Sequence, residues 1–149
     1  MLPNNTIERF KARLVARGFS QVPGLEYDES MTHSPVVRHT TLRAVLAHAA
    51  QANWPVHQWT CHMQMWPQIN GNNWNRHIDA WFKSQGFTPS DADPCMYSRH
   101  SADGKVVFIV CLYVDDLLIT GPILTATDAF KVRISLAFPM KDLGVLNTS

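Results

Sequence analysis

The chain has 149 residues, a formal net charge of +1 and 46% hydrophobic residues. This length suits one domain with a real core and is too short for two comfortable ones. A net charge near zero excludes a protein that binds nucleic acid through bulk positive charge, so any such contact needs a local basic patch. Charged residues make up 17% of the chain, which is typical of a globular protein.

The three cysteines are widely spaced and form no pattern of zinc ligands. We therefore expect reduced thiols in an intracellular protein. The polar stretch MLPNNTIERF has no apolar segment of the kind that signal peptides carry, and no stretch reaches transmembrane length. A cytoplasmic or nuclear location without membrane contact is expected.

The first element is a strand predicted over residues 9–19, where side chains alternate between two sides. One side carries Lys11, Arg13 and Arg17. The guanidinium group of Arg and the ammonium group of Lys bind phosphate oxygens well, which makes these residues candidates for contacts with nucleic acid. The alternative is a solvated basic edge strand.

A helix is predicted over residues 40–54, with apolar side chains at helical spacing behind a Thr40 or Thr41 cap. Pro55 ends this helix, and a short strand is expected at 56–60. Residues 61–73 show no clear period. A second helix is expected over 74–87, where the spacing of Trp74, Ile78, Trp81 and Phe82 gives one apolar face and Gly86 offers a C-terminal cap.

Two hairpins follow in the sequence. Residues 95–100 and 105–114 flank an Asp-Gly turn signal, and a second turn is expected at Asp115 and Asp116, between the apolar stretches 105–114 and 117–121. A last helix is predicted over residues 128–138, before Pro139. Strands and helices mix without regular alternation, which favours an α+β domain with an antiparallel sheet and packed helices.

The Asp115–Asp116 pair is the main candidate site, because two adjacent carboxylates in an apolar stretch are costly to desolvate. At the tip of a hairpin both carboxylates can lean toward one Mg²⁺, a cation that takes oxygen ligands and usually keeps several waters. Paired ions of this kind serve phosphoryl transfer in polymerases and nucleases. The alternative is that two turn-forming residues make an ordinary loop.

Seven blocks of this sequence follow one another in a fixed order: KARLVARGFSQ (11–21), SPVVRHTTLRAVLAHAAQ (34–51), VHQ (56–58), WNRHIDAWFKSQGF (74–87), DADPCMYSR (91–99), LYVDDLLITG (112–121) and FPMKDLG (138–144). These blocks and their order closely resemble the reverse transcriptase domain of copia-type (Ty1/copia) retrotransposon polyproteins.

The resemblance implies an RNA-directed DNA polymerase of the right-hand type, with residues 1–39 in partial fingers and 40–149 in a partial palm. It implies two-metal nucleotidyl transfer with Mg²⁺ or Mn²⁺ at Asp115 and Asp116, with a template-primer of RNA or DNA and dNTPs as partners. The basic residues of the first strand would touch template or triphosphate, and Lys141 would lie near the leaving pyrophosphate. A surface lysine after a helix is the alternative for Lys141.

This chain departs from the family pattern after VHQ, where the family carries a third metal-binding aspartate. Here Thr60 occupies that position, and a hydroxyl is a neutral, weak ligand for Mg²⁺. The family's nucleotide-positioning motif is also missing except for Trp74, which indicates an internal deletion around residues 60–73. We expect Trp74 and His57 to be packing residues.

Asp79, Asp91 and Asp93 are not convincing substitutes for the missing carboxylate.

Three interpretations of this chain follow from its differences from the family pattern. One is a working polymerase, and the second is a catalytically impaired or non-catalytic remnant that retains metal or nucleic-acid binding. The third is an artefact of gene modelling, with a longer active protein in the cell. The first is disfavoured, because two-metal chemistry depends on positioning and charge neutralisation together.

Overall fold

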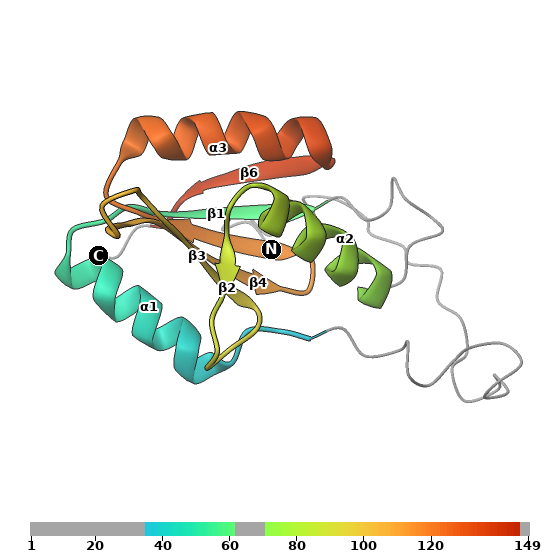
Figure 1. Ribbon diagram of the computed structural model, residues 1–149, viewed down its shortest axis with the longest axis horizontal. Coiled ribbons are helices and arrows are strands. Elements are labelled where there is room, and N and C mark those ends of the chain that lie inside the picture. The colour runs from blue at the N-terminus through green and yellow to red at the C-terminus, as the bar shows by residue number, and fades with distance from the viewer. Residues whose placement is uncertain (1–34, 62–70, 147–149) are drawn as a thin grey trace, which may run out of the picture.

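The computed structural model describes residues 35–61 and 71–146. In this part of the chain, three helices pack on one antiparallel sheet with the strand order β2-β3-β4-β5-β1-β6. The elements are α1 (His39–Gln51), β1 (Val56–Cys61), α2 (Gly71–Ser84), β2 (Thr88–Pro89), β3 (Met96–His100), β4 (Val106–Tyr113), β5 (Asp116–Thr120), α3 (Leu124–Ala137) and β6 (Met140–Val145). The expected α+β class is confirmed, and Figure 1 shows the arrangement.

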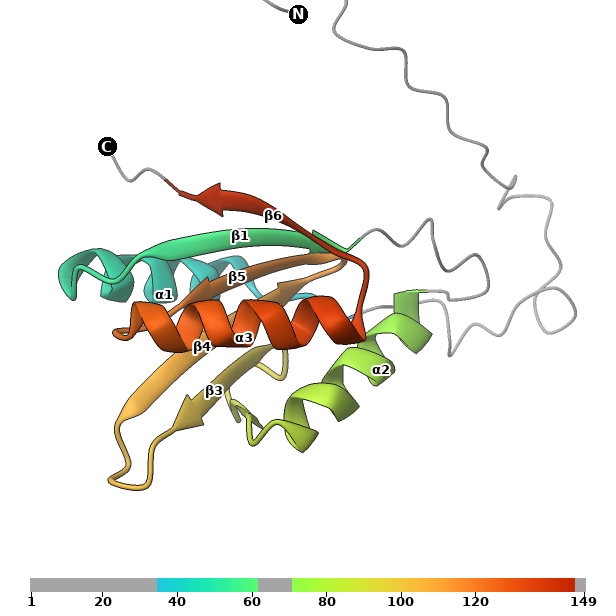
Figure 2. The same cartoon turned by 90° about the horizontal axis from the view of Figure 1, so that it is seen from above.

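The helices cover both faces of the sheet. Figure 2 shows α2 and α3 on one side and α1 on the other. Between α2, α3 and the sheet lies an aromatic core, in which Phe130 of α3 contacts Phe82 of α2 and Phe108 of β4 with ring centroids 6.4 and 5.5 Å apart. All three rings are fully buried or nearly so, and burial of such large apolar side chains supplies most of the stabilisation.

Strand β1 lies between β5 and β6, although both partners come much later in the sequence. Its register with β5 runs from the Val56–Thr120 pair to the Thr60–Asp116 pair. The strand expected at 56–60 is therefore confirmed. Because β1 covers the edge of β5, the apolar strands of the hairpin are not left open on that side.

Several boundaries differ from the sequence-based expectation. Helix α1 begins at His39 rather than behind a threonine cap, and the Arg38 N–H donates to the Asp93 carboxylate at 2.8 Å. Helix α3 begins at Leu124, one turn before the predicted start. Strand β6 was not predicted, because nearly all of it is exposed and its pairing with β1 is non-local.

The turns that glycine signals predicted are confirmed. Gly104 adopts a φ of 80° between β3 and β4, and Gly86 adopts a φ of 79° after α2. The three cysteines are free and buried. Within residues 35–61 and 71–146, no helix has both the length and the apolar character needed to span a membrane.

Candidate functional site

The hairpin of β4 and β5 ends in a two-residue turn made of Val114 and Asp115. Asp116 already belongs to β5 and pairs with Tyr113. The expectation that the two aspartates together form the turn is therefore wrong by one residue. Val114 has a φ of 55°, a backbone conformation that is an outlier for a β-branched residue. The turn is strained at the residue that precedes the two carboxylates.

Two hydrogen bonds hold this turn against the rest of the fold. The Trp74 indole N–H of α2 donates to the Val114 carbonyl at 2.7 Å. The Cys61 N–H at the end of β1 donates to the Asp115 carbonyl, also at 2.7 Å. Trp74 is fully buried, and its ring meets Phe138 edge-on with centroids 5.2 Å apart. The prediction that Trp74 only packs is thus incomplete, because its N–H contacts the candidate site.

A row of cross-strand partners crosses four strands beside the turn. Tyr113 of β4 pairs with Asp116 of β5, Asp116 pairs with Thr60 of β1, and Thr60 pairs with Lys141 of β6. Cross-strand partners in an antiparallel sheet lie on the same face, with Cβ atoms about 4.5–5.5 Å apart. The structure therefore brings Asp116, Thr60 and Lys141 together, with the threonine between the carboxylate and the ammonium group.

The turn and strand β5 supply one carboxylate each, those of Asp115 and Asp116. Asp115 and Asp116 are both partly exposed. Among the described residues, no group of three His, Cys, Asp or Glu side chains is placed to hold a metal ion. Burial, and after it the charge of Asp115, raises the pKa of the Cys61 thiol to about 11, which keeps this neighbouring sulfur in the thiol form.

Two of the three aspartates considered as substitutes, Asp79 and Asp93, have structural partners of their own. Asp79 accepts hydrogen bonds from Lys83 at 2.8 Å and from the Tyr97 hydroxyl at 3.0 Å. Asp93 is buried and accepts from the backbone, while Asp91 is exposed in the same loop. The expectation that none of them replaces the missing carboxylate stays a prediction.

The basic residues of the predicted first strand, Lys11, Arg13 and Arg17, lie outside the described residues. Lys141 is described, and it is exposed on the edge strand β6. It was predicted only as a residue after a helix, whereas the register places it two strands from Asp116. Its neighbourhood could not be read from the sequence, because β6 itself was missed.

A partly buried polar cluster on the helix α3 side of the sheet was also missed. The Lys131 ammonium lies 2.9 Å from His57 Nδ1 and 3.0 Å from the Asp142 carboxylate. It also lies 5.6 Å from the centre of the Trp59 ring. The cluster joins α3, β1 and β6, so its role is to fix the edge strand. His57 is buried as expected, but it is a polar partner of Lys131 as well as a packing residue.

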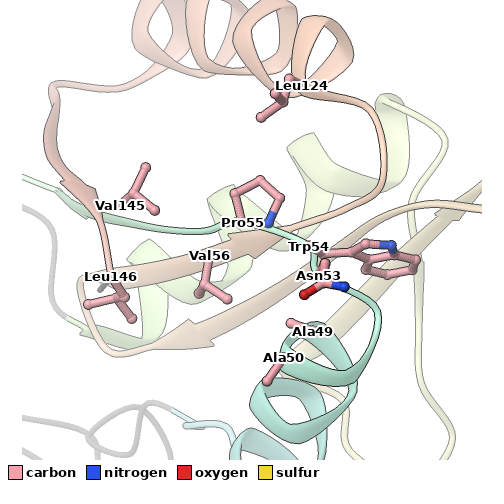
Figure 3. A pocket seen from close by; sticks show the side chains of 9 residues that line it. All are labelled: Ala49, Ala50, Asn53, Trp54, Pro55, Val56, Leu124, Val145 and Leu146. Atoms are coloured by element: carbon pink, nitrogen blue, oxygen red, sulfur yellow. The ribbon is translucent and has the colours of Figure 1, made fainter. Parts of the chain in front are cut away.

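Two open cavities lie against the sheet. One, of about 290 Å³, lies beside the candidate site, and Leu42, Leu118 and Asp116 are among its lining residues. The other, of about 410 Å³, lies where β1 and α3 begin and β6 ends, as Figure 3 shows from close by. Its lining includes Val56, whose partner Thr120 is at the opposite end of the β1–β5 register from Asp116. The larger cavity is therefore separate from the turn.

Comparison with known proteins agrees with the sequence blocks. A model of the family described as "Reverse transcriptase (RNA-dependent DNA polymerase)" matches residues 3–65 and 67–148. No solved structure matches the chain.

Curated relatives include three retrovirus-related Pol polyproteins from transposons. That of TNT 1-94 from Nicotiana tabacum is 31% identical over 170 positions, which cover 91% of this chain and 13% of the relative. Those of RE1 and RE2 from Arabidopsis thaliana are each 28% identical, covering 93% and 79% of this chain and 12% and 10% of the relatives. The chain thus spans about an eighth of the length of the first two relatives. It belongs to the reverse transcriptase (RNA-dependent DNA polymerase) family, in its copia-type branch.

Proposed function

We propose that this chain is a fragment of an RNA-directed DNA polymerase domain that no longer transfers nucleotides. In this proposal it retains weak binding of one divalent cation, Mg²⁺ or Mn²⁺, at Asp115 and Asp116. Residues 1–39 correspond to partial fingers and 40–149 to a partial palm. The observation that carries the proposal is the pairing of Thr60 with Asp116, which puts a hydroxyl where the family has a carboxylate.

The donor set suits one ion and does not suit two. One or two carboxylates with several waters make an ordinary Mg²⁺ site. Two dications held close together need more negative charge, and the described part of the chain offers no third acidic ligand. Two-metal transfer also depends on positioned reactants, so the loss of charge and of the nucleotide-positioning motif both oppose it.

A nucleic-acid contact belongs to the same proposal. Lys141 is exposed beside Thr60 and Asp116, where its ammonium group can reach a phosphate of a template-primer or dNTP. Lys11, Arg13 and Arg17 of the strand predicted from the sequence are proposed to add phosphate contacts. Because the chain carries a net charge of only +1, this binding should depend on these four basic side chains and should weaken as the salt concentration rises.

The lengths of the alignments support an internal deletion. The alignments to the TNT 1-94 and RE1 polyproteins run over 170 and 173 positions, whereas the whole chain has 149 residues. Those relatives therefore carry residues in the aligned region that this chain lacks. The alternative is a gene-model artefact, and sequencing of the transcript across residues 58–74 decides between them. An unbroken read that encodes this chain excludes the artefact.

Primer extension on an RNA template with Mg²⁺ or Mn²⁺ tests the absence of transfer. We expect no synthesis, and synthesis that disappears in an Asp115→Ala variant would overturn the proposal.

Calorimetric titration with Mn²⁺ tests the retained site. Weak binding should be lost in Asp115→Asn and kept in Asp91→Asn, which removes an exposed charge elsewhere. Equal binding in all three proteins would place the ion at another site.

A further inference from the structure

We infer that Trp74 is a positioning residue for the Asp115–Asp116 pair, and that it acts through the backbone of Val114. The inference rests on the proposed cation site and adds the element that orients it. Trp74 belongs to α2, 40 residues before the turn in sequence, and its indole N–H donates to the Val114 carbonyl at 2.7 Å. Helix α2 thereby contacts the one residue that precedes both carboxylates.

The strain at Val114 explains why the turn needs such a contact. A valine with a φ of 55° is disfavoured by its own Cβ, and such a residue persists only where the surroundings hold it. Two-residue hairpin turns that need this φ usually place glycine there. Here the side chain of Val114 is 39% exposed, so its own packing provides limited restraint. The hydrogen bond from Trp74 supplies restraint from outside the hairpin.

The position of Trp74 makes the contact rigid. The side chain is fully buried, and its ring packs edge-on against Phe138. An indole N–H is a donor only, and a buried donor that loses its acceptor is costly, so this hydrogen bond favours the observed turn. The Cys61 N–H holds the next carbonyl, that of Asp115. Together the two donors fix successive peptide groups of the turn, and hence the directions in which Asp115 and Asp116 leave the backbone.

Trp74→Phe tests the inference, because it keeps an aromatic ring and removes the indole N–H together with part of the ring volume. Trp81→Phe is the matched control, since Trp81 lies on the same helix and packs by ring contacts with Phe130 and Phe138. A positive φ brings the amide proton and Hα of Val114 close together and gives a strong intraresidue NOE. We expect Trp74→Phe to weaken this NOE and to reduce Mn²⁺ affinity roughly fivefold, as the loss of one hydrogen bond predicts. Trp81→Phe should change neither.

Val114→Gly completes a double-mutant cycle. Glycine adopts a positive φ without strain, so the turn should no longer need the donor. Trp74→Phe is then expected to change Mn²⁺ affinity less than twofold in the glycine background. If Trp74→Phe alone does not fold, the double variant decides, since it should fold and bind Mn²⁺.

The outcomes separate the inference from the proposed function. An unchanged Val114 NOE in Trp74→Phe overturns the inference, as does an equal loss of affinity in both backgrounds or a folded double variant that does not bind. Absence of Mn²⁺ binding in the parent chain contradicts the proposed function instead. In that case the NOE still tests the contact between Trp74 and the turn.

Discussion

Thr60 of β1 and Asp116 of β5 are direct cross-strand partners at the end of the sheet where the hairpin turns. Partners in this register have Cβ atoms about 4.5–5.5 Å apart on one face. A carboxylate at position 60 would therefore reach an ion held by Asp116. The same closeness means that, without an ion, two carboxylates there would repel each other.

Thr60→Asp should raise the affinity for Mn²⁺ by about fivefold or more, because an added charge at this distance contributes more than about 1 kcal/mol. Without metal, the variant should lose about 0.5–1 kcal/mol of unfolding free energy through like-charge repulsion. Calorimetry measures the first effect, and denaturant unfolding with and without Mn²⁺ measures the second.

The control for this variant is Thr88→Asp, which adds the same charge at an exposed site on β2, at the other edge of the sheet. Its affinity for Mn²⁺ should match that of the parent chain. Similar gains in both variants would mean that bulk charge, rather than position 60, attracts the ion.

His57 should make stability depend on pH. Burial, and after it the nearby Lys131 ammonium, lowers the pKa of His57, while Asp142 and Asp128 oppose the shift. Because Lys131 donates to Nδ1, the proton of the neutral ring lies on Nε2, which is buried and has no hydrogen-bond partner among the described residues. Protonation of the ring would place two cations in contact.

The unfolded chain binds a proton at His57 near pH 6.5, whereas the folded chain binds it only at lower pH. Stability from this group is therefore complete above about pH 6.5 and is lost as pH falls toward the folded pKa, by at most about 1.4 kcal/mol per pH unit. Melting temperatures between pH 7.5 and 5 measure the slope. His57→Gln removes the titration and should flatten it, and an unchanged slope would assign the effect to other groups.

Much of the fold could be predicted from local patterns, because apolar spacing reports which face of an element is buried. The helix face of Ile78 and Phe82 is an example. The hairpin turn lies one residue earlier in the chain than predicted, and the reason is non-local. Local preference argues against valine at a positive φ, and the contact that holds Val114 comes from Trp74, 40 residues earlier.

The site was predictable in part for the same reason. Asp115, Asp116 and Thr60 were found through sequence blocks, but the row that links Asp116 to Lys141 depends on β6. An exposed edge strand shows little alternation of apolar and polar residues, so its sequence does not reveal it. The partners of Lys131 were missed likewise, because three separate elements bring them together.

Asp93 should be a large contributor to stability. Burial favours a raised pKa for this carboxyl, but hydrogen bonds from the Arg38 N–H, the Thr41 side chain and the Cys95 N–H lower its pKa overall. The carboxylate accepts the N–H of Arg38, the residue directly before α1, from a loop that lies 55 residues later in the chain. Asp93→Ala leaves these donors, of which the Cys95 N–H is buried, without an acceptor and should cost about 2–4 kcal/mol of unfolding free energy.

Asp91→Ala, at an exposed position in the same loop, is the control for Asp93→Ala and should stay within about 0.5 kcal/mol of the parent. Denaturant unfolding at pH 7 measures both. Equal small effects would show that α1 does not need this cap. Because the pKa of Asp93 is lowered, its contribution should be present above about pH 4 and should fall as the pH drops below that.

Gly121 directly after β5 should not tolerate a side chain. A Cβ built at this position would lie 2.3 Å from the Val107 carbonyl oxygen, and that oxygen belongs to the backbone of β4. Relief of the clash requires β4 and the chain after β5 to separate, so Gly121→Ala should cost at least about 1–3 kcal/mol of unfolding free energy.

Ser98→Thr, which adds one methyl group at a partly exposed position of β3, should cost much less. If the two variants were equally stable, β4 and β5 would have to pack less closely at Gly121 than the structure shows. Since β5 also carries Asp116, a Gly121→Ala protein that does fold should bind Mn²⁺ as the parent does, because the clash lies at the end of the hairpin away from the turn.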